Sequence, residues 1–272
     1  MKKINFIIPK CSKEKIIKII ECFDNISYRF LNENVKFEIF SDKLEQDIFF
    51  LNNLCKDISY TLEKVEKKNW IKEIKKNDIT TETALFIFHQ GFRKISTTKN
   101  KIIIPASSAF GTGSHESTIL IIKSIEKIIK KTKFNLPLDI GTGTGILSFI
   151  LNIKLKKKIY ATDISLDSKN NFQQNKKINK LNNLIFIKSY GMNNIILKKK
   201  KFDLIVANLL LNEHKRVIGN ICKNIKKKGF YFISGILDTQ INYFIVLLRG
   251  LNLRLYDSMK LNGWVCLVFI KY

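Results

Sequence analysis

The spacing of apolar residues predicts a small α+β domain over the first 65 residues. The expected strands are residues 5–8, 26–31, 35–40 and 61–65, and the expected helices are residues 13–23 and 46–58. Apolar and polar positions alternate in the strands, whereas apolar positions recur every three or four residues in the helices. The order βαββαβ is the split, ferredoxin-like arrangement.

The rest of the chain alternates short apolar runs with amphipathic stretches. The expected strands are residues 137–140, 158–162, 184–188, 202–207 and 229–234, and the expected helices are residues 117–130, 146–154, 167–180, 212–227 and 238–248. Near-continuous apolar strands are typical of a parallel sheet that is buried on both faces. Residues 253–259 and 264–270 read as an antiparallel hairpin. We therefore predict an α/β fold, a doubly wound Rossmann-like sheet with an antiparallel C-terminal edge hairpin, preceded by the ferredoxin-like domain.

This pattern divides the chain into three parts. Residues 1–65 are the expected N-terminal domain, residues 66–100 a linker with a connecting helix around Trp70, and residues 101–272 the larger domain. Short strands at residues 83–89 and 101–105 are expected to lead into the larger domain.

The chain of 272 residues is strongly basic, with 48 Lys and Arg against 23 Asp and Glu, which gives a formal charge of +25. Such a charge favours contact with polyanions. Two interpretations stay open. One is a basic surface that contacts ribosomal RNA. The other is a compositional bias of the whole proteome, because lysine is frequent even in loops such as residues 198–201.

Composition also excludes several classes of protein. The five cysteines are widely spaced without a C-x-x-C pair, which argues against a disulfide framework and a cysteine-based zinc site. No apolar run approaches the roughly 18 residues that span a bilayer. The apolar part of the N-terminus is too short for a signal peptide and meets Pro9. We expect a soluble, cytoplasmic, metal-free protein.

A glycine-rich turn follows the first strand of the larger domain. Residues 138–147 read L-D-I-G-T-G-T-G-I-L, a strand that passes through G-x-G-x-G into a helix. Glycine is needed where the backbone turns tightly and where a ligand approaches it closely. Ile146 stands where the dinucleotide pattern requires glycine, so the turn fits S-adenosylmethionine better than NAD. A purely structural turn is the alternative.

Two polar residues each end a strand at the same predicted crevice. Asp163 ends one strand, where an acidic side chain of a doubly wound fold accepts hydrogen bonds from ribose hydroxyls. Its alternative role is to cap the next helix. Asn208 ends another strand, and its alternative role is to begin a turn. The Gly-, Ser- and Thr-rich loop at residues 109–118 has backbone amides and hydroxyls that suit the methionine end of a cofactor.

Four blocks together resemble a known family. They are F-G-T-G-S-H-E-S-T (residues 110–118), L-D-I-G-T-G-T-G-I-L (138–147), D-L-I-V-A-N-L-L (203–210) and S-G-I-L-D-T-Q (234–240). Their order and spacing look like the PrmA family, the methyltransferases of the large-subunit ribosomal protein numbered eleven. Trp70 falls where that family has a linker tryptophan. The resemblance covers about residues 105–245.

The resemblance implies a class I methyltransferase sheet and an S-adenosylmethionine-dependent protein-lysine N-methyltransferase, whose acceptors are lysine side-chain and N-terminal amino groups of that ribosomal protein. It implies an N-terminal domain that recognises the substrate protein, and Asn208 near the methyl-transfer centre, where its carbonyl would orient the amine. The implied cofactor-binding residues are Thr118, Gly141, Gly143, Asp163 and Asn208, and Asn175 and Asn179 match two further asparagines.

This chain departs from the family pattern in three places. Glu116 replaces a proline, Thr142 replaces a cysteine, and Ser165 replaces the second acid of D-I-D. His115 and Glu116 are the only general-base candidates near the crevice. Two other functions stay open for a monomer of this kind: an RNA methyltransferase, which predicts positive charge around the crevice mouth, and a non-catalytic ribosome-associated binding module.

Overall fold

The computed structural model describes residues 2–23, 26–41, 43–55, 58–64, 80–91, 95–105 and 113–272. The chain divides into two compact units, Met1–Lys76 (unit 1) and Asn77–Tyr272 (unit 2). The predicted connecting helix around Trp70 lies outside the described residues, so the linker stays a prediction.

Unit 1 has the predicted βαββαβ order. Its elements are β1 (Lys2–Pro9), α1 (Lys13–Cys22), β2 (Ile26–Phe30), β3 (Asn34–Ser41), α2 (Leu44–Leu54) and β4 (Tyr60–Lys64). The strands form an antiparallel sheet in the order β2-β3-β1-β4. Alternate residues of β1 and β3 face the helices, and the rings of Phe6 and Phe37 stack at 5.1 Å in the core between them. Helix α2 ends at Leu54, four residues earlier than predicted.

Unit 2 is built around a seven-stranded sheet. Its order is β10-β9-β8-β11-β12-β14-β13, with β8 (Pro137–Ile140), β9 (Ile159–Asp163), β10 (Leu184–Lys188), β11 (Phe202–Asn208), β12 (Ile225–Leu237), β13 (Leu253–Leu261) and β14 (Trp264–Lys271). The first five of these strands are parallel, and β14 runs antiparallel between β12 and β13. The predicted doubly wound sheet with a C-terminal hairpin is confirmed.

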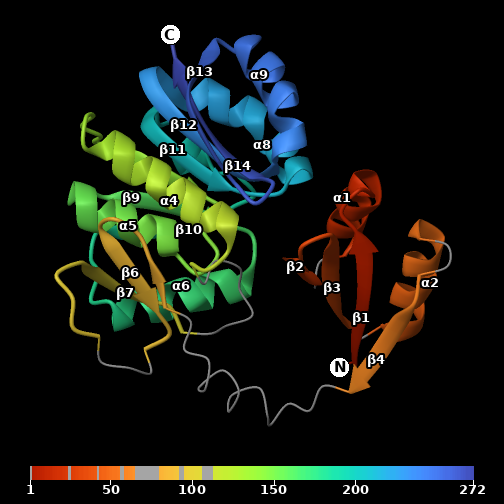
Figure 1. The fold of residues 1–272 in the computed structure, drawn as a ribbon. Coiled ribbons are helices and arrows are strands. Elements are labelled where there is room, and N and C mark those ends of the chain that lie inside the picture. Colours follow the sequence, from red (N-terminus) through yellow and green to blue (C-terminus); the bar gives the residue numbers. More distant parts are fainter. Residues whose placement is uncertain are drawn as a thin grey trace. The chain divides into compact units, whose positions relative to one another are not determined.

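Helices cover both faces of this sheet (Figure 1). They are α4 (Glu116–Ile129), α5 (Ile146–Leu155), α6 (Leu166–Ile178), α7 (Ile195–Lys198), α8 (Leu211–Asn224) and α9 (Ile241–Arg249), with a 3₁₀ turn, η1 (Asp238–Gln240), before α9. Buried side chains of α8 and α9 share one core cluster with alternate residues of β8, β11 and β12. Helices α4 and α5 contact each other and lie outside this cluster. The short helix α7 is absent from the sequence prediction.

One boundary differs from the prediction in a way that matters below. The chain leaves α8 at Asn224, not at residue 227, and Ile225 already pairs with Phe202 of β11. The next pair is Leu204 with Phe230. Residues 226–229 of β12 therefore form a bulge between these two pairs, because four residues stand opposite one.

A small three-stranded sheet belongs to unit 2. It contains β5 (Thr81–Glu82), β6 (Phe86–His89) and β7 (Asn100–Ile103), in that order. The buried carboxylate of Glu126 on α4 accepts hydrogen bonds from Thr83 Oγ1 at 2.6 Å and Leu85 N at 2.9 Å. This side-chain contact attaches the small sheet to the larger one.

No helix among the described residues is both long enough and apolar enough to cross a bilayer.

Candidate functional site

The glycine turn lies at the carboxyl end of β8 and leads directly into α5. Gly141, Gly143 and Gly145 have φ values of +70°, +52° and +94°, a region that residues with a Cβ adopt only with strain. The amides of Gly141 and Thr142 donate to Thr162 O of β9 at 2.8 and 2.9 Å. The turn is thereby closed against the neighbouring strand.

Asp139, to which the sequence analysis gave no role, stabilises this turn through its side chain. It is fully buried, and its Oδ2 accepts hydrogen bonds from Thr142 Oγ1 at 2.6 Å, Ser148 Oγ at 2.7 Å and Ser148 N at 3.0 Å. Burial raises the pKa of Asp139 to about 6, opposed by these hydrogen bonds and assisted by the charge of Asp163. The sequence signal that could have identified Asp139 was a single acidic residue within an apolar strand.

The raised pKa predicts a pH-dependent stability. Folded Asp139 binds its proton more tightly than the unfolded side chain, whose pKa is near 3.8. Its contribution to stability is therefore complete below pH ~4 and is lost as the pH rises through ~6, by up to about 3 kcal/mol. Asp139→Asn should lack this dependence. Denaturant unfolding of both proteins at several pH values measures it, and parallel curves would contradict the assignment.

Asp163 lies at the tip of β9 with its carboxylate partly exposed. Oδ2 accepts a hydrogen bond from Gly143 N at 3.0 Å, and Oδ1 accepts one from Ser165 N at 3.0 Å. Each oxygen keeps a second lone pair. The Ser165 side chain accepts from the amides of Asp167 and Ser168 as the N-cap of α6, so the capping role belongs to Ser165. Asp163 is thus connected to the glycine turn and remains able to accept hydrogen bonds from a ligand.

Thr118 and Asn208 come together from α4 and β11. Asn208 Nδ2 donates to Thr118 Oγ1 at 3.1 Å, and Thr118 is fully buried. Among the described residues, Asn208 Oδ1 has no hydrogen-bond partner although it is buried. Leu209 follows Asn208, and its side chain occupies the space that a Cβ on Gly141 would need. The end of β11 therefore contacts the glycine turn.

A glycine outside the turn, Gly235, supports the end of β11 and was missed by the sequence analysis. Gly235 interrupts the apolar residues of β12 at φ +80°. A Cβ there would lie 2.5 Å from Leu209 O and 2.9 Å from Asn208 Oδ1. Next to it, Ser234 O accepts from Leu209 N at 3.1 Å and contacts His214 Nε2 at 2.9 Å. Burial lowers the pKa of His214 to about 4, so the ring is neutral at pH 7 and serves as an internal hydrogen-bonding group.

Asn175 of α6 and Asn179, the residue that follows the helix, both bind backbone groups. Asn175 Nδ2 donates to Thr144 O of the glycine turn at 3.0 Å. One helical turn later, Asn179 Oδ1 accepts from Ile103 N at 2.8 Å, and its Nδ2 donates to Ile103 O at 2.7 Å. Their positions indicate a supporting role for both side chains.

His115 is the N-cap of α4. Its Nδ1 accepts from Ser117 N at 3.2 Å and lies 2.8 Å from Ser117 Oγ. Burial lowers its pKa, opposed by the charge of Glu116. This local capping geometry favours a structural role. Residues 110–112 of the same motif lie outside the described residues.

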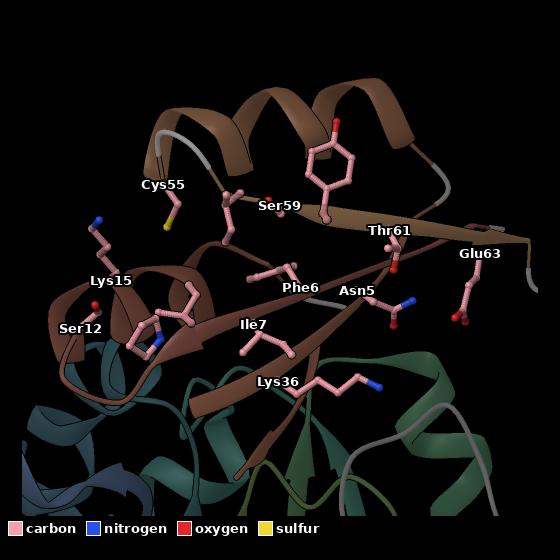
Figure 2. Close-up of a pocket in the computed structure, with 14 residues that line it drawn as sticks. Asn5, Phe6, Ile7, Ser12, Lys15, Lys36, Cys55, Ser59, Thr61 and Glu63 are labelled. Atoms are coloured by element: carbon pink, nitrogen blue, oxygen red, sulfur yellow. The ribbon is translucent and has the colours of Figure 1, made fainter. Parts of the chain in front are cut away.

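Unit 1 contains a cavity of about 640 Å³ along β1. Pairing between β1 and β4 ends at Phe6 and Tyr60, so among the described residues the end of β1 has no strand partner on that side. Figure 2 shows Lys15 and Ser12 on the α1 side of the cavity, with Lys36 and Glu63 at other positions around it. The cavity thus combines an apolar floor with charges of both signs.

The described residues contain no group of three or more His, Cys, Asp or Glu side chains that could hold a metal ion.

Known proteins resemble the chain over most of its length. The family described as "Ribosomal protein L11 methyltransferase (PrmA)" matches residues 9–272. A ribosomal protein L11 methyltransferase of Prochlorococcus marinus (strain MIT 9312) is 36% identical over 208 residues, 74% of this chain and 65% of that protein. One of Caldicellulosiruptor saccharolyticus is 28% identical over 98% of this chain and 81% of that protein. The chain thus spans about 65% of the length of the former relative.

A solved structure supports the fold. The crystal structure of a ribosomal protein L11 methylase from Lactobacillus delbrueckii subsp. bulgaricus superposes with a TM-score of 0.64 at 23% identity, covering 71% of this chain and 99% of that one.

Proposed function

Because the chain belongs to the family of ribosomal protein L11 methyltransferases (PrmA), we propose that it transfers methyl groups from S-adenosylmethionine to amino groups of ribosomal protein L11. The acceptors in this proposal are lysine side chains and the N-terminal amine, and the enzyme acts as a cytoplasmic monomer. The observation that carries the proposal is the meeting of the glycine turn, Asp163 and the Thr118–Asn208 pair at one end of the sheet.

The residues present fit S-adenosylmethionine. Asp163 would accept hydrogen bonds from the ribose hydroxyls with its remaining lone pairs, at the end of the strand next to the glycine turn. Thr118 and Asn208 would complete the site. When bound, the cofactor supplies a methyl group on a positively charged sulfur, which is already an activated leaving group.

The remaining requirement of the reaction is a neutral amine. A lysine with an ordinary pKa of ~10.4 is neutral in only about 1 part in 2,500 at pH 7, a cost of about 4.6 kcal/mol. A crevice that removes water from the ammonium lowers that cost. The free acceptor Oδ1 of Asn208 would take an N–H of the amine and orient its lone pair. Loss of the proton to water before capture needs no general base, and His115 is already used as a helix cap.

Charge at the mouth favours a protein substrate over RNA. The segments at the carboxyl ends of β8 to β12 (141–145, 163–168, 188–194, 208–214 and 234–240) contain one basic residue, Lys188, which pairs with Asp163 in the sheet. An RNA substrate would need positive charge there. A cationic lysine side chain instead meets one like charge and four carboxylates in these segments.

We propose that unit 1 recognises the substrate protein. The cavity along β1 supports this, since an extended segment can add to the unpaired end of a strand while its side chains enter adjacent pockets. Lys15, Lys36 and Glu63 would select charged partners on that segment.

The proposed function is tested with methyl-labelled S-adenosylmethionine and whole ribosomal extract. We expect label in ribosomal protein L11, and methyl transfer reduced at least about tenfold by Asn208→Ala, the effect of one lost hydrogen bond of ~1.5 kcal/mol. Label in purified RNA would support the rival RNA methyltransferase. Absence of both label and calorimetric cofactor binding would support the non-catalytic module.

A further inference from the structure

Lysines in unit 2 are concentrated at one end of the seven-stranded sheet. In a parallel sheet with helical crossovers, the loops that enter the strands all lie at the amino edge, opposite the site. Sixteen lysines occupy the ends of the preceding helices and the loops that lead into β8, β9, β10, β11 and β12: Lys130, Lys131, Lys133, Lys154, Lys156, Lys157, Lys158, Lys180, Lys198, Lys199, Lys200, Lys201, Lys223, Lys226, Lys227 and Lys228. We call this set the lysine edge.

Acidic residues do not neutralise this edge. Asp203 is the only carboxylate in the segments 130–136, 154–158, 180–183, 198–203 and 223–229. Its two oxygens accept hydrogen bonds from Asn135 N and Leu136 N, each at 2.9 Å, and Lys226 Nζ is 3.9 Å away. Fourteen of the sixteen side chains are exposed, all but Lys154 and Lys200.

The β12 bulge pushes three of these lysines outward. Between the pairs Phe202–Ile225 and Leu204–Phe230, residues 226–228 leave the ladder and stand exposed. Lys228 has φ +60°, which an ordinary strand would not require. Lys201 Nζ donates to Lys223 O at 2.5 Å and ties the neighbouring loop to the same place. The positive charges are therefore carried on a folded framework.

The contrast between the two ends of one sheet argues against a mere compositional bias. Such a bias would place similar numbers of lysines at both ends, whereas the carboxyl-end segments 141–145, 163–168, 188–194, 208–214 and 234–240 have one, Lys188, and carry four carboxylates, Asp163, Asp167, Glu213 and Asp238. Five residues of strand separate the ends by about 17 Å. This exceeds the screening length of about 8 Å at physiological salt, so the edge attracts polyanions without acting on the mouth.

We propose that the lysine edge binds the phosphate backbone of RNA while the opposite end of the sheet stays free for methyl transfer. A row of exposed amines across five adjacent strands, about 4.8 Å apart, matches a charged strand that runs along the edge. Lysine binds phosphate as a point charge, so the binding is independent of sequence. This proposal goes beyond the proposed function and is separable from it.

The test is binding of a fluorescent single-stranded RNA to the full chain at a series of salt concentrations. The edge variant carries Lys157→Gln, Lys158→Gln, Lys199→Gln and Lys227→Gln, all exposed. The matched control removes the same charge elsewhere in unit 2: Lys101→Gln, Lys123→Gln, Lys169→Gln and Lys260→Gln, also exposed. We expect the edge variant to lose at least about tenfold in affinity at 0.1 M salt, with its log–log salt slope reduced by about 3, and the control to stay within about twofold.

Three results would overturn the proposal. Equal losses in both variants would mean that only net charge matters. Undetectable RNA binding by the unmodified chain would remove the partner. Binding to phosphatidylcholine–phosphatidylglycerol vesicles without binding to RNA would assign the edge to a membrane surface. Methyl transfer to free ribosomal protein L11, measured in parallel, should be the same in all three proteins, so failure here is distinguishable from failure of the proposed function.

Discussion

Asp163→Ala should lower the affinity for S-adenosylmethionine by about 10²–10⁴-fold and leave unit 2 folded. The carboxylate is the proposed acceptor for two ribose hydroxyls, and each hydrogen bond to a charged group contributes about 1.5–3 kcal/mol. Asp163 itself is partly exposed, so water can enter the space that the carboxylate leaves and accept from Gly143 N and Ser165 N. Titration calorimetry with S-adenosylmethionine measures the affinity, and circular dichroism checks the fold.

Asp163→Asn is the matched control. Its amide keeps one oxygen acceptor and the shape of the side chain but loses the charge, so the affinity should fall between those of the parent and the alanine variant. Equal cofactor affinity in all three proteins would remove Asp163 from the site.

Gly235→Ala should destabilise unit 2 by about 4 kcal/mol and nearly abolish methyl transfer. A methyl group at this position would collide with Leu209 O at 2.5 Å and Asn208 Oδ1 at 2.9 Å, so the end of β11 must move. Forcing an extra methyl into a packed region costs about 1–3 kcal/mol, and a left-handed φ adds about 1–2 kcal/mol for a residue with a Cβ. Denaturant unfolding and the methyl-transfer assay measure the two effects.

Gly263→Ala separates the collision from the backbone strain. Gly263 has φ +82°, close to that of Gly235, yet an added Cβ there would meet nothing within 4 Å. This control should lose only about 1–2 kcal/mol and retain its activity. If the two variants behave alike, the close approach of Gly235 to Asn208 has no functional role.

The fold could be read from the sequence because its local and long-range signals agree. Apolar runs such as Leu204–Ala207 identify parallel strands, and the alternation in β1 and β3 identifies the sheet of unit 1. The boundary of α8 was wrong because Ile225 and the three lysines after it suit a helix locally, whereas pairing with Phe202 decides the structure. Helix α7 was missed because four residues are too few for a periodic signal.

The candidate site was only partly accessible from the sequence. Motif positions gave Asp163, Asn208 and the glycine turn, since these residues follow strands. The roles of Asp139 and Gly235 depend on residues that lie close to them in space. These are Ser148 for Asp139 and Leu209 for Gly235. The lysine edge was hidden for the same reason, because its lysines are scattered in the sequence and share a place only once the strand order is known.

Helix α6 is attached by hydrogen bonds to two other parts of unit 2. Asn175 Nδ2 donates to Thr144 O, and Asn179 binds both backbone groups of Ile103 in β7, a strand of the small three-stranded sheet. The helix therefore connects the small sheet to the glycine turn. If the small sheet shifts relative to the glycine turn, either α6 moves with it or the hydrogen bonds of Asn175 or Asn179 break.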